Sequence, residues 1–68
     1  MSEIEYTICQ VIKKYTNIKG EFPNINQIAR RIYYSNNGTK YHLKKLIKLG
    51  IIEKTDDSKY KLLVSNLK

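Results

Sequence analysis

The sequence of 68 residues predicts a mainly α-helical domain that ends in a small β-hairpin. Two observations predict this fold class. Apolar residues recur at helical spacing in three segments, and each segment follows a residue that is suited to cap a helix. After Gly50, two short β-prone runs are separated by turn-forming residues. We expect one domain over residues 1–68, with helices over about 3–16, 25–33 and 36–49 and a hairpin over about 51–64.

The first helix is predicted from a capping motif and an apolar stripe. Ser2 and Glu5 fit the capping box, in which each side chain binds the backbone amide of the other residue. The stripe that follows places five residues on one helical face: Ile4, Ile8, Val11, Ile12 and Tyr15. We expect Glu5 to lie off this apolar face, and residues 17–20 to form a loop.

The second and third helices are predicted in the same way. Asn24 is a suitable N-cap for the second helix, and Ser35 is the natural cap of the third. Gly50 is expected to end the third helix in a left-handed conformation, with Ile51 folding back on Leu46.

One pair of residues allows a different local structure. Asn37 and Gly38 are a strong signal for a two-residue turn, which would join two strands in place of the third helix. The apolar residues after Gly38 recur at helical rather than alternating spacing, and the lysines suit a helix surface. The helix is therefore the preferred interpretation.

The charge of the chain is strongly positive and unevenly placed. The formal net charge is +7, of which residues 1–35 carry +2 and residues 36–68 carry +5. No acidic residue occurs between Glu21 and Glu53, whereas six basic residues do: Arg30, Arg31, Lys40, Lys44, Lys45 and Lys48. A surface of one sign repels itself, which indicates a polyanionic partner, and nucleic acid is the first candidate.

Several classes of function are not expected. One cysteine and one histidine cannot form a disulfide or a zinc-ligand set, so no cofactor or metal is predicted. No apolar stretch approaches the roughly 20 residues that cross a bilayer, and the acidic N-terminus lacks a signal-peptide pattern, so we expect a cytoplasmic protein without membrane contact. His42 has no carboxylate or cysteine at a matching spacing, and we interpret it as structural or DNA-facing. We expect neither an enzyme nor a small-molecule effector site.

Three helices and then a hairpin, with the basic face on the third helix, form a winged helix-turn-helix. Three stretches resemble the core of bacterial and phage winged-helix regulators of the MarR-like, ArsR-like and LexA-like kinds: Pro23-x-Ile25-x-x-Ile28-Ala29-x-x-Ile32-x-x-Ser35, then Tyr41-His42-Leu43-Lys44-Lys45-Leu46, then Leu49-Gly50-Ile51-Ile52. The chain departs from that pattern at Tyr33, where the turn usually carries glycine, and at Thr39, which takes a normally aliphatic core position.

The resemblance implies binding of double-stranded DNA, with the third helix in the major groove. The outer face and the N-terminal end of that helix hold the candidate contacts: Ser35, Asn36, Asn37, Gly38, Lys40, Tyr41, Lys44 and Lys48. Asparagine pairs with adenine, and lysine donates to guanine or to phosphate. On the wing, Lys54 and Lys59 are candidates for shallow contact with the DNA backbone, because two aspartates make the tip acidic.

A small transcriptional regulator, such as a phage, plasmid or bacterial repressor, is the preferred function. A homodimer on a palindromic DNA site would fit this function. Its two subunits would contact each other through the first helix, the C-terminal tail or the turn tyrosines. The simpler interpretation of the asparagines is turn formation, and that of the lysines is a solvated face. Two other functions stay open: a module that binds a partner protein rather than DNA, and binding of RNA or single-stranded DNA by stacking on Tyr33, Tyr34 and Tyr41.

Overall fold

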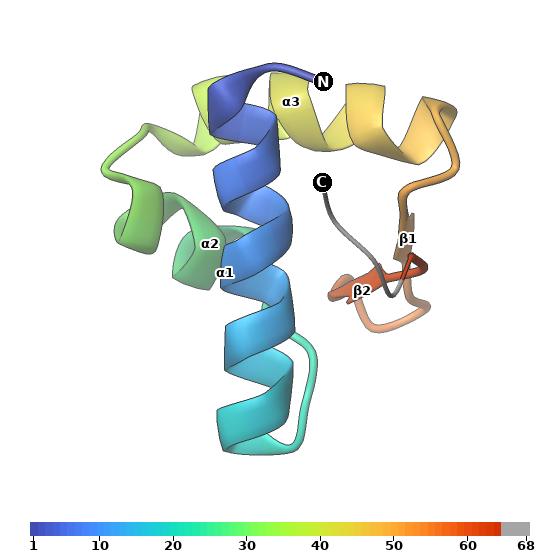
Figure 1. Cartoon of the computed structure of the whole chain (residues 1–68). Coiled ribbons are helices and arrows are strands. Elements are labelled where there is room, and N and C mark those ends of the chain that lie inside the picture. Colours follow the sequence, from blue (N-terminus) through green and yellow to red (C-terminus); the bar gives the residue numbers. More distant parts are fainter. Residues whose placement is uncertain (65–68) are drawn as a thin grey trace.

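The computed structural model describes residues 1–64, which form three helices followed by a two-stranded antiparallel hairpin (Figure 1). The bounds are α1 Glu3–Lys19, α2 Ile25–Ile32, α3 Asn36–Lys48, β1 Ile52–Lys54 and β2 Tyr60–Leu62. The strands pair in the register Ile52↔Leu62, Glu53↔Lys61 and Lys54↔Tyr60. This arrangement confirms the predicted fold class, a mainly α-helical winged helix-turn-helix. The last four residues of the expected domain, 65–68, lie outside the described part.

The core lies where α1 meets α2, α3 and the hairpin. Figure 1 shows α1 crossing both other helices, with the hairpin on the opposite side of α1 from α2. Side chains from all three helices and both strands fill this space: Ile8, Cys9, Ile12, Ile28, Ile32, Leu43, Leu46, Ile52 and Tyr60. Burial raises the pKa of the Cys9 thiol, with a smaller contribution from the charge of Glu5, so Cys9 serves as a small apolar residue.

The predicted capping contacts are confirmed at the start of each helix. At α1, the Glu5 amide donates to Ser2 Oγ over 3.3 Å and the Ser2 amide donates to Glu5 Oε1 over 3.2 Å. At α2, Asn24 and Gln27 make the same reciprocal pair, at 2.9 and 2.8 Å. At α3, the side chain of Ser35 caps the first turn. These contacts satisfy amides that have no partner within the helix.

The first helix is longer than the sequence predicted, because α1 continues to Lys19 instead of ending near residue 16. Thr16 Oγ1 donates to the Ile12 carbonyl over 2.7 Å, which satisfies its hydroxyl within the helix. Gly20 then ends the helix with a φ of 72°, and its amide lies 2.9 Å from the Thr16 carbonyl. Glycine adopts this left-handed conformation without steric cost, so Gly20 was the signal for the helix end.

The turn between α2 and α3 depends on Tyr33. This residue has a φ of 60° and a ψ of 38°, the left-handed conformation for which the resembling proteins use glycine. A non-glycine residue pays about 1–2 kcal/mol for it. The ring is 94% exposed, so no burial of Tyr33 offsets that cost. The following tyrosine, Tyr34, is 44% exposed, so neither ring is buried in the core.

The end of α3 has the predicted Schellman geometry. Gly50 has a φ of 75°, its amide donates to the Ile47 carbonyl over 3.0 Å, and the Ile51 amide donates to the Leu46 carbonyl over 3.0 Å. Ile51 packs against the core that contains Leu46. These bonds turn the chain directly from α3 into β1.

The hairpin is attached to the segment that precedes α2. The Tyr60 amide donates to the Pro23 carbonyl over 2.9 Å, and Asn24 and Lys59 form an isolated antiparallel bridge. Main-chain bonds therefore fix the position of the wing relative to the helix-turn-helix.

Candidate nucleic-acid interface

The outer face of α3 carries an exposed stripe of polar and basic side chains. Asn37, Tyr41, Lys44 and Lys48 recur at intervals of four, three and four residues, and all four are exposed, as is Lys40 beside them. The Tyr41 ring is 67% exposed, so it does not join the core. The opposite face of the helix is buried through Thr39, Leu43 and Leu46.

The first turn of α3 is held by hydrogen bonds within the protein. Ser35 Oγ accepts from the Gly38 amide over 3.1 Å, and the buried Thr39 hydroxyl donates to the Ser35 carbonyl over 2.8 Å. The Asn36 side-chain amide donates to Asn26 Oδ1 on α2. Asn36 is therefore bonded across the helix-turn-helix, although both Asn36 and Asn37 are exposed.

Gly38 lies close to two neighbouring side chains. A Cβ at this position would lie 3.3 Å from Ser35 Oγ and 3.4 Å from a ring carbon of Tyr34. Its φ is not in the left-handed region. The glycine thus leaves room for the capping side chain of Ser35, whereas the contact with Tyr34 would be an ordinary one.

The structure places a buried carboxylate behind α3, which corrects the expectation for Glu5. Glu5 is 1% exposed rather than lying off the apolar face, and its Oε2 lies 3.0 Å from His42 Nδ1. Lys45 Nζ lies 3.7 Å from the same oxygen. An ionised carboxylate only accepts hydrogen bonds, so Nδ1 of His42 carries the proton. His42 therefore has a structural role, one of its two expected roles, and its carboxylate partner lies 37 residues earlier in the sequence.

The pKa of Glu5 lies below its ordinary value of 4.5. The hydrogen bond from His42 is the main cause, and the Ser2 amide and the charges of Lys45 and His42 act in the same direction. Burial alone would raise this pKa. These contacts outweigh the effect of burial on the pKa, so Glu5 carries its charge at neutral pH. Lys45 is drawn toward α1 and lies apart from the exposed stripe.

Two tyrosines surround His42. Tyr34 and Tyr41 both meet its ring edge-to-face, with centroids 6.0 and 5.3 Å away. The imidazole is thus fixed on one side by Glu5 and on the others by aromatic rings. Tyr41, although exposed, is oriented by this contact.

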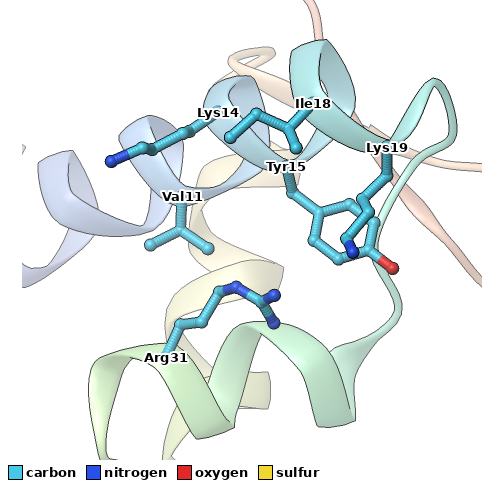
Figure 2. Close-up of a pocket in the computed structure, with 6 residues that line it drawn as sticks. All are labelled: Val11, Lys14, Tyr15, Ile18, Lys19 and Arg31. Carbon is cyan, nitrogen blue, oxygen red and sulfur yellow. The ribbon is translucent and has the colours of Figure 1, made fainter.

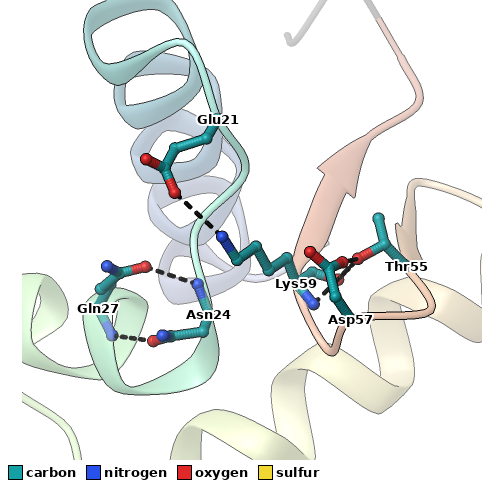
Figure 3. A network of polar contacts seen from close by, with 6 residues as sticks. All are labelled: Glu21, Asn24, Gln27, Thr55, Asp57 and Lys59. Carbon is teal, nitrogen blue, oxygen red and sulfur yellow. Dashed lines mark hydrogen bonds and ion pairs between the residues drawn. The ribbon is translucent and has the colours of Figure 1, made fainter.

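On the wing, the two candidate lysines differ in their surroundings. Lys54 at the end of β1 is exposed. Lys59 Nζ lies 3.0 Å from Glu21 Oε1 in the loop before α2, and its backbone amide donates to Thr55 Oγ1 over 3.1 Å (Figure 3). A phosphate contact from Lys59 would compete with this ion pair. At the tip, the Thr55 hydroxyl donates to the Asp57 carboxylate and lowers the pKa of Asp57.

Residues 1–64 hold no cluster of three or more His, Cys, Asp or Glu side chains placed to bind a metal ion. None of the described helices has the length and apolar character needed to span a membrane.

The fold and this basic helix face define a winged helix-turn-helix protein. Residues 23–53 match the family described as winged helix-turn-helix DNA-binding. The matched segment covers α2, α3 and the start of β1, and it confirms the resemblance to winged helix-turn-helix DNA-binding domains. No curated protein matches the chain.

Proposed function

We propose that the protein binds double-stranded DNA sequence-specifically and acts as a small transcriptional regulator, a repressor in the simplest case. The observation that supports this function is the exposed stripe on α3, which is polar or basic throughout and lies on the helix that enters the major groove in this fold. The family match over residues 23–53 supports the same partner.

Each residue of the stripe has a role in this proposal. Asn37 reads an adenine edge, and Lys40 and Lys44 donate to guanine or to phosphate. Tyr41 contacts a thymine methyl group or a phosphate, and Lys48 adds a backbone contact at the far end of the helix. Asn36 has one amide hydrogen and its carbonyl oxygen left beside its bond to Asn26.

The ends of the interface contribute phosphate contacts. The N-terminal turn of α3, around Ser35 and Gly38, presents the positive end of the helix dipole to the DNA backbone. On the wing, Lys54 makes a shallow backbone contact, while the aspartates at the tip keep the hairpin out of the minor groove. Lys59 contributes only when its bond to Glu21 opens.

The test is selection of duplexes from a random-sequence library, followed by binding measurements on the recovered site. Lys40→Glu with Lys44→Glu should abolish binding. Lys13→Glu with Lys14→Glu is the matched control, because it makes the same change of charge on exposed residues of α1. The control should lose only a modest, sequence-independent part of the affinity.

The outcomes separate this function from the alternatives. An enriched motif lost in the α3 variant supports the proposal, and an inverted repeat would indicate a homodimer on DNA. Equal losses in both variants would mean that the protein binds polyanions without using α3. A greater loss on replacing Tyr33 and Tyr34 than on replacing Lys40, with single strands preferred, would favour stacking on RNA or single-stranded DNA. No enrichment at all would favour a module that binds a partner protein.

A further inference from the structure

A groove runs between α1 and α2, away from the stripe on α3. Its volume is about 340 Å³, and Figure 2 shows the side chains of the two helices that line it: Val11, Lys14, Tyr15, Ile18, Lys19 and Arg31. This volume lies near the lower end of the range of concave ligand sites in proteins. The proposed DNA contacts include none of these residues.

The floor and one wall of the groove are apolar. The Tyr15 ring is 8% exposed and forms the floor, and Val11 is half-buried beside it. Ile18, about one helical turn beyond Tyr15 and two beyond Val11, is 68% exposed. An isoleucine that projects from a long helix toward solvent, next to a hollow, offers apolar surface that a partner would cover.

The charged residues of the groove are all cationic. Lys14, Lys19 and Arg31 line it, and no carboxylate does. The ion pairs of residues 1–64 engage only His42, Lys45 and Lys59 as cations. The three groove cations therefore keep their charge available for a partner, and the surface attracts negative groups.

Arg31 is held in a fixed position. Its guanidinium carbon lies 4.9 Å from the centroid of the Tyr15 ring, and its Nη1 donates to the Gln27 carbonyl over 3.2 Å. Arginine has five N–H donors in a planar fork, so most of them stay available. A guanidinium that is already oriented loses less entropy when it binds a carboxylate, and its geometry suits two parallel hydrogen bonds.

We propose that this groove binds an acidic amphipathic helix of a partner protein. The apolar side chains of that helix would cover Val11, Tyr15 and Ile18, and its carboxylates would pair with the three groove cations. A second copy of this chain fits poorly, because two copies each carry a net charge of +7. Duplex DNA fits poorly as well, because its phosphates would leave Ile18 exposed. The inference goes beyond DNA binding and does not depend on it.

The test uses a synthetic amphipathic helix with leucine along one face and glutamate elsewhere, labelled for fluorescence anisotropy. Two variants, Ile18→Glu and Arg31→Glu, should each weaken its binding by about tenfold or more. Lys14→Glu and Lys13→Glu form a matched pair, because these neighbouring exposed lysines lie on different sides of α1 and only Lys14 lines the groove. Lys14→Glu should weaken binding, and Lys13→Glu should not.

Further measurements decide the outcome. Amide shifts of the labelled protein on adding the peptide should concentrate on α1 and α2, and a peptide with alanine in place of leucine should bind much more weakly. The proposal is overturned if both peptides bind alike, if Lys13→Glu matches Lys14→Glu, or if Lys40→Glu removes peptide binding. It is also overturned if the protein alone sediments as a dimer that Ile18→Glu dissociates, because the groove would then hold a second copy. DNA binding should persist in the groove variants whether or not the peptide binds.

Discussion

Glu5 and His42 are 37 residues apart in the sequence, and a 3.0 Å bond joins the carboxylate of one to the imidazole of the other. Through Oε1 the same carboxylate accepts the Ser2 amide at the start of α1. One side chain therefore caps the first helix and holds the helix that carries the proposed DNA contacts.

Replacing Glu5 by glutamine should lower the free energy of unfolding by about 2–3 kcal/mol at neutral pH, because bonds to a charged acceptor are lost in a buried site. Replacing His42 by alanine should also destabilise the protein. The double variant should lose less than the sum, by about 1–2 kcal/mol, because each single change removes the same contact. Urea unfolding of the four proteins measures this coupling. Strict additivity would show that the bond contributes nothing.

Stability should fall in acid because of Glu5. Its pKa in the folded protein is below the ordinary value of 4.5, so its stabilising effect is complete above that pH and is lost as the pH falls through the folded pKa. Glu5→Gln should flatten the stability profile below pH 4.5. Glu3 is an exposed residue of the same turn, and Glu3→Gln is the control. This variant should still lose stability below pH 4.5 as the unchanged protein does. Asp57 is unchanged in both variants, so its lowered pKa does not enter the comparison.

Replacing Tyr33 by glycine should stabilise the fold by about 0.5–1 kcal/mol. The left-handed strain at this position disappears, and the greater freedom of glycine in the unfolded chain removes only part of the gain. Thermal and urea unfolding measure the change. Destabilisation would mean that the exposed ring makes contacts that offset its strained backbone. DNA affinity of the same variant shows whether Tyr33 takes part in binding.

The salt dependence of DNA binding should report the individual lysines. Each lysine that neutralises a phosphate contributes about 0.9 to the slope of log affinity against log salt. Replacing Lys44 by glutamine should lower the slope by up to this amount, provided that Lys44 contacts phosphate. Lys59→Gln should change the slope less, because that ammonium is already paired with Glu21. Equal effects of the two substitutions would show that the ion pair between Lys59 and Glu21 does not persist when the protein binds DNA.

Most of the fold follows from local signals in the sequence. The caps at Ser2, Asn24 and Ser35 and the glycine end of α3 at Gly50 depend on residues that are neighbours along the chain. Such contacts can be derived from spacing and side-chain chemistry. The exposed stripe on α3 follows as well, because helical periodicity separates Lys44 and its neighbours from the buried face.

The features that the sequence did not predict are contacts between distant segments and the position at which α1 ends. No periodicity links Glu5 to His42, so the burial of Glu5 depends on how α1 crosses α3. Likewise, the pairing of Lys59 with Glu21 is set by the way the hairpin attaches before α2. Gly20 marks the true end of α1, whereas the loop-prone residues before it indicate an earlier end. The contact of α3 with DNA bases stays a prediction.

The bond from the Tyr60 amide to the Pro23 carbonyl has a consequence for engineering chimeric regulators. The family match ends at residue 53, so an exchange of modules at that boundary would separate β2 from the strand-like segment it bonds. Because both groups belong to the main chain, a transplanted hairpin still supplies a donor for the Pro23 carbonyl, provided that its backbone follows the same path and position 60 is not proline. Substitutions of side chains in either segment should therefore leave this attachment of the wing intact, whereas proline at position 60 should release it.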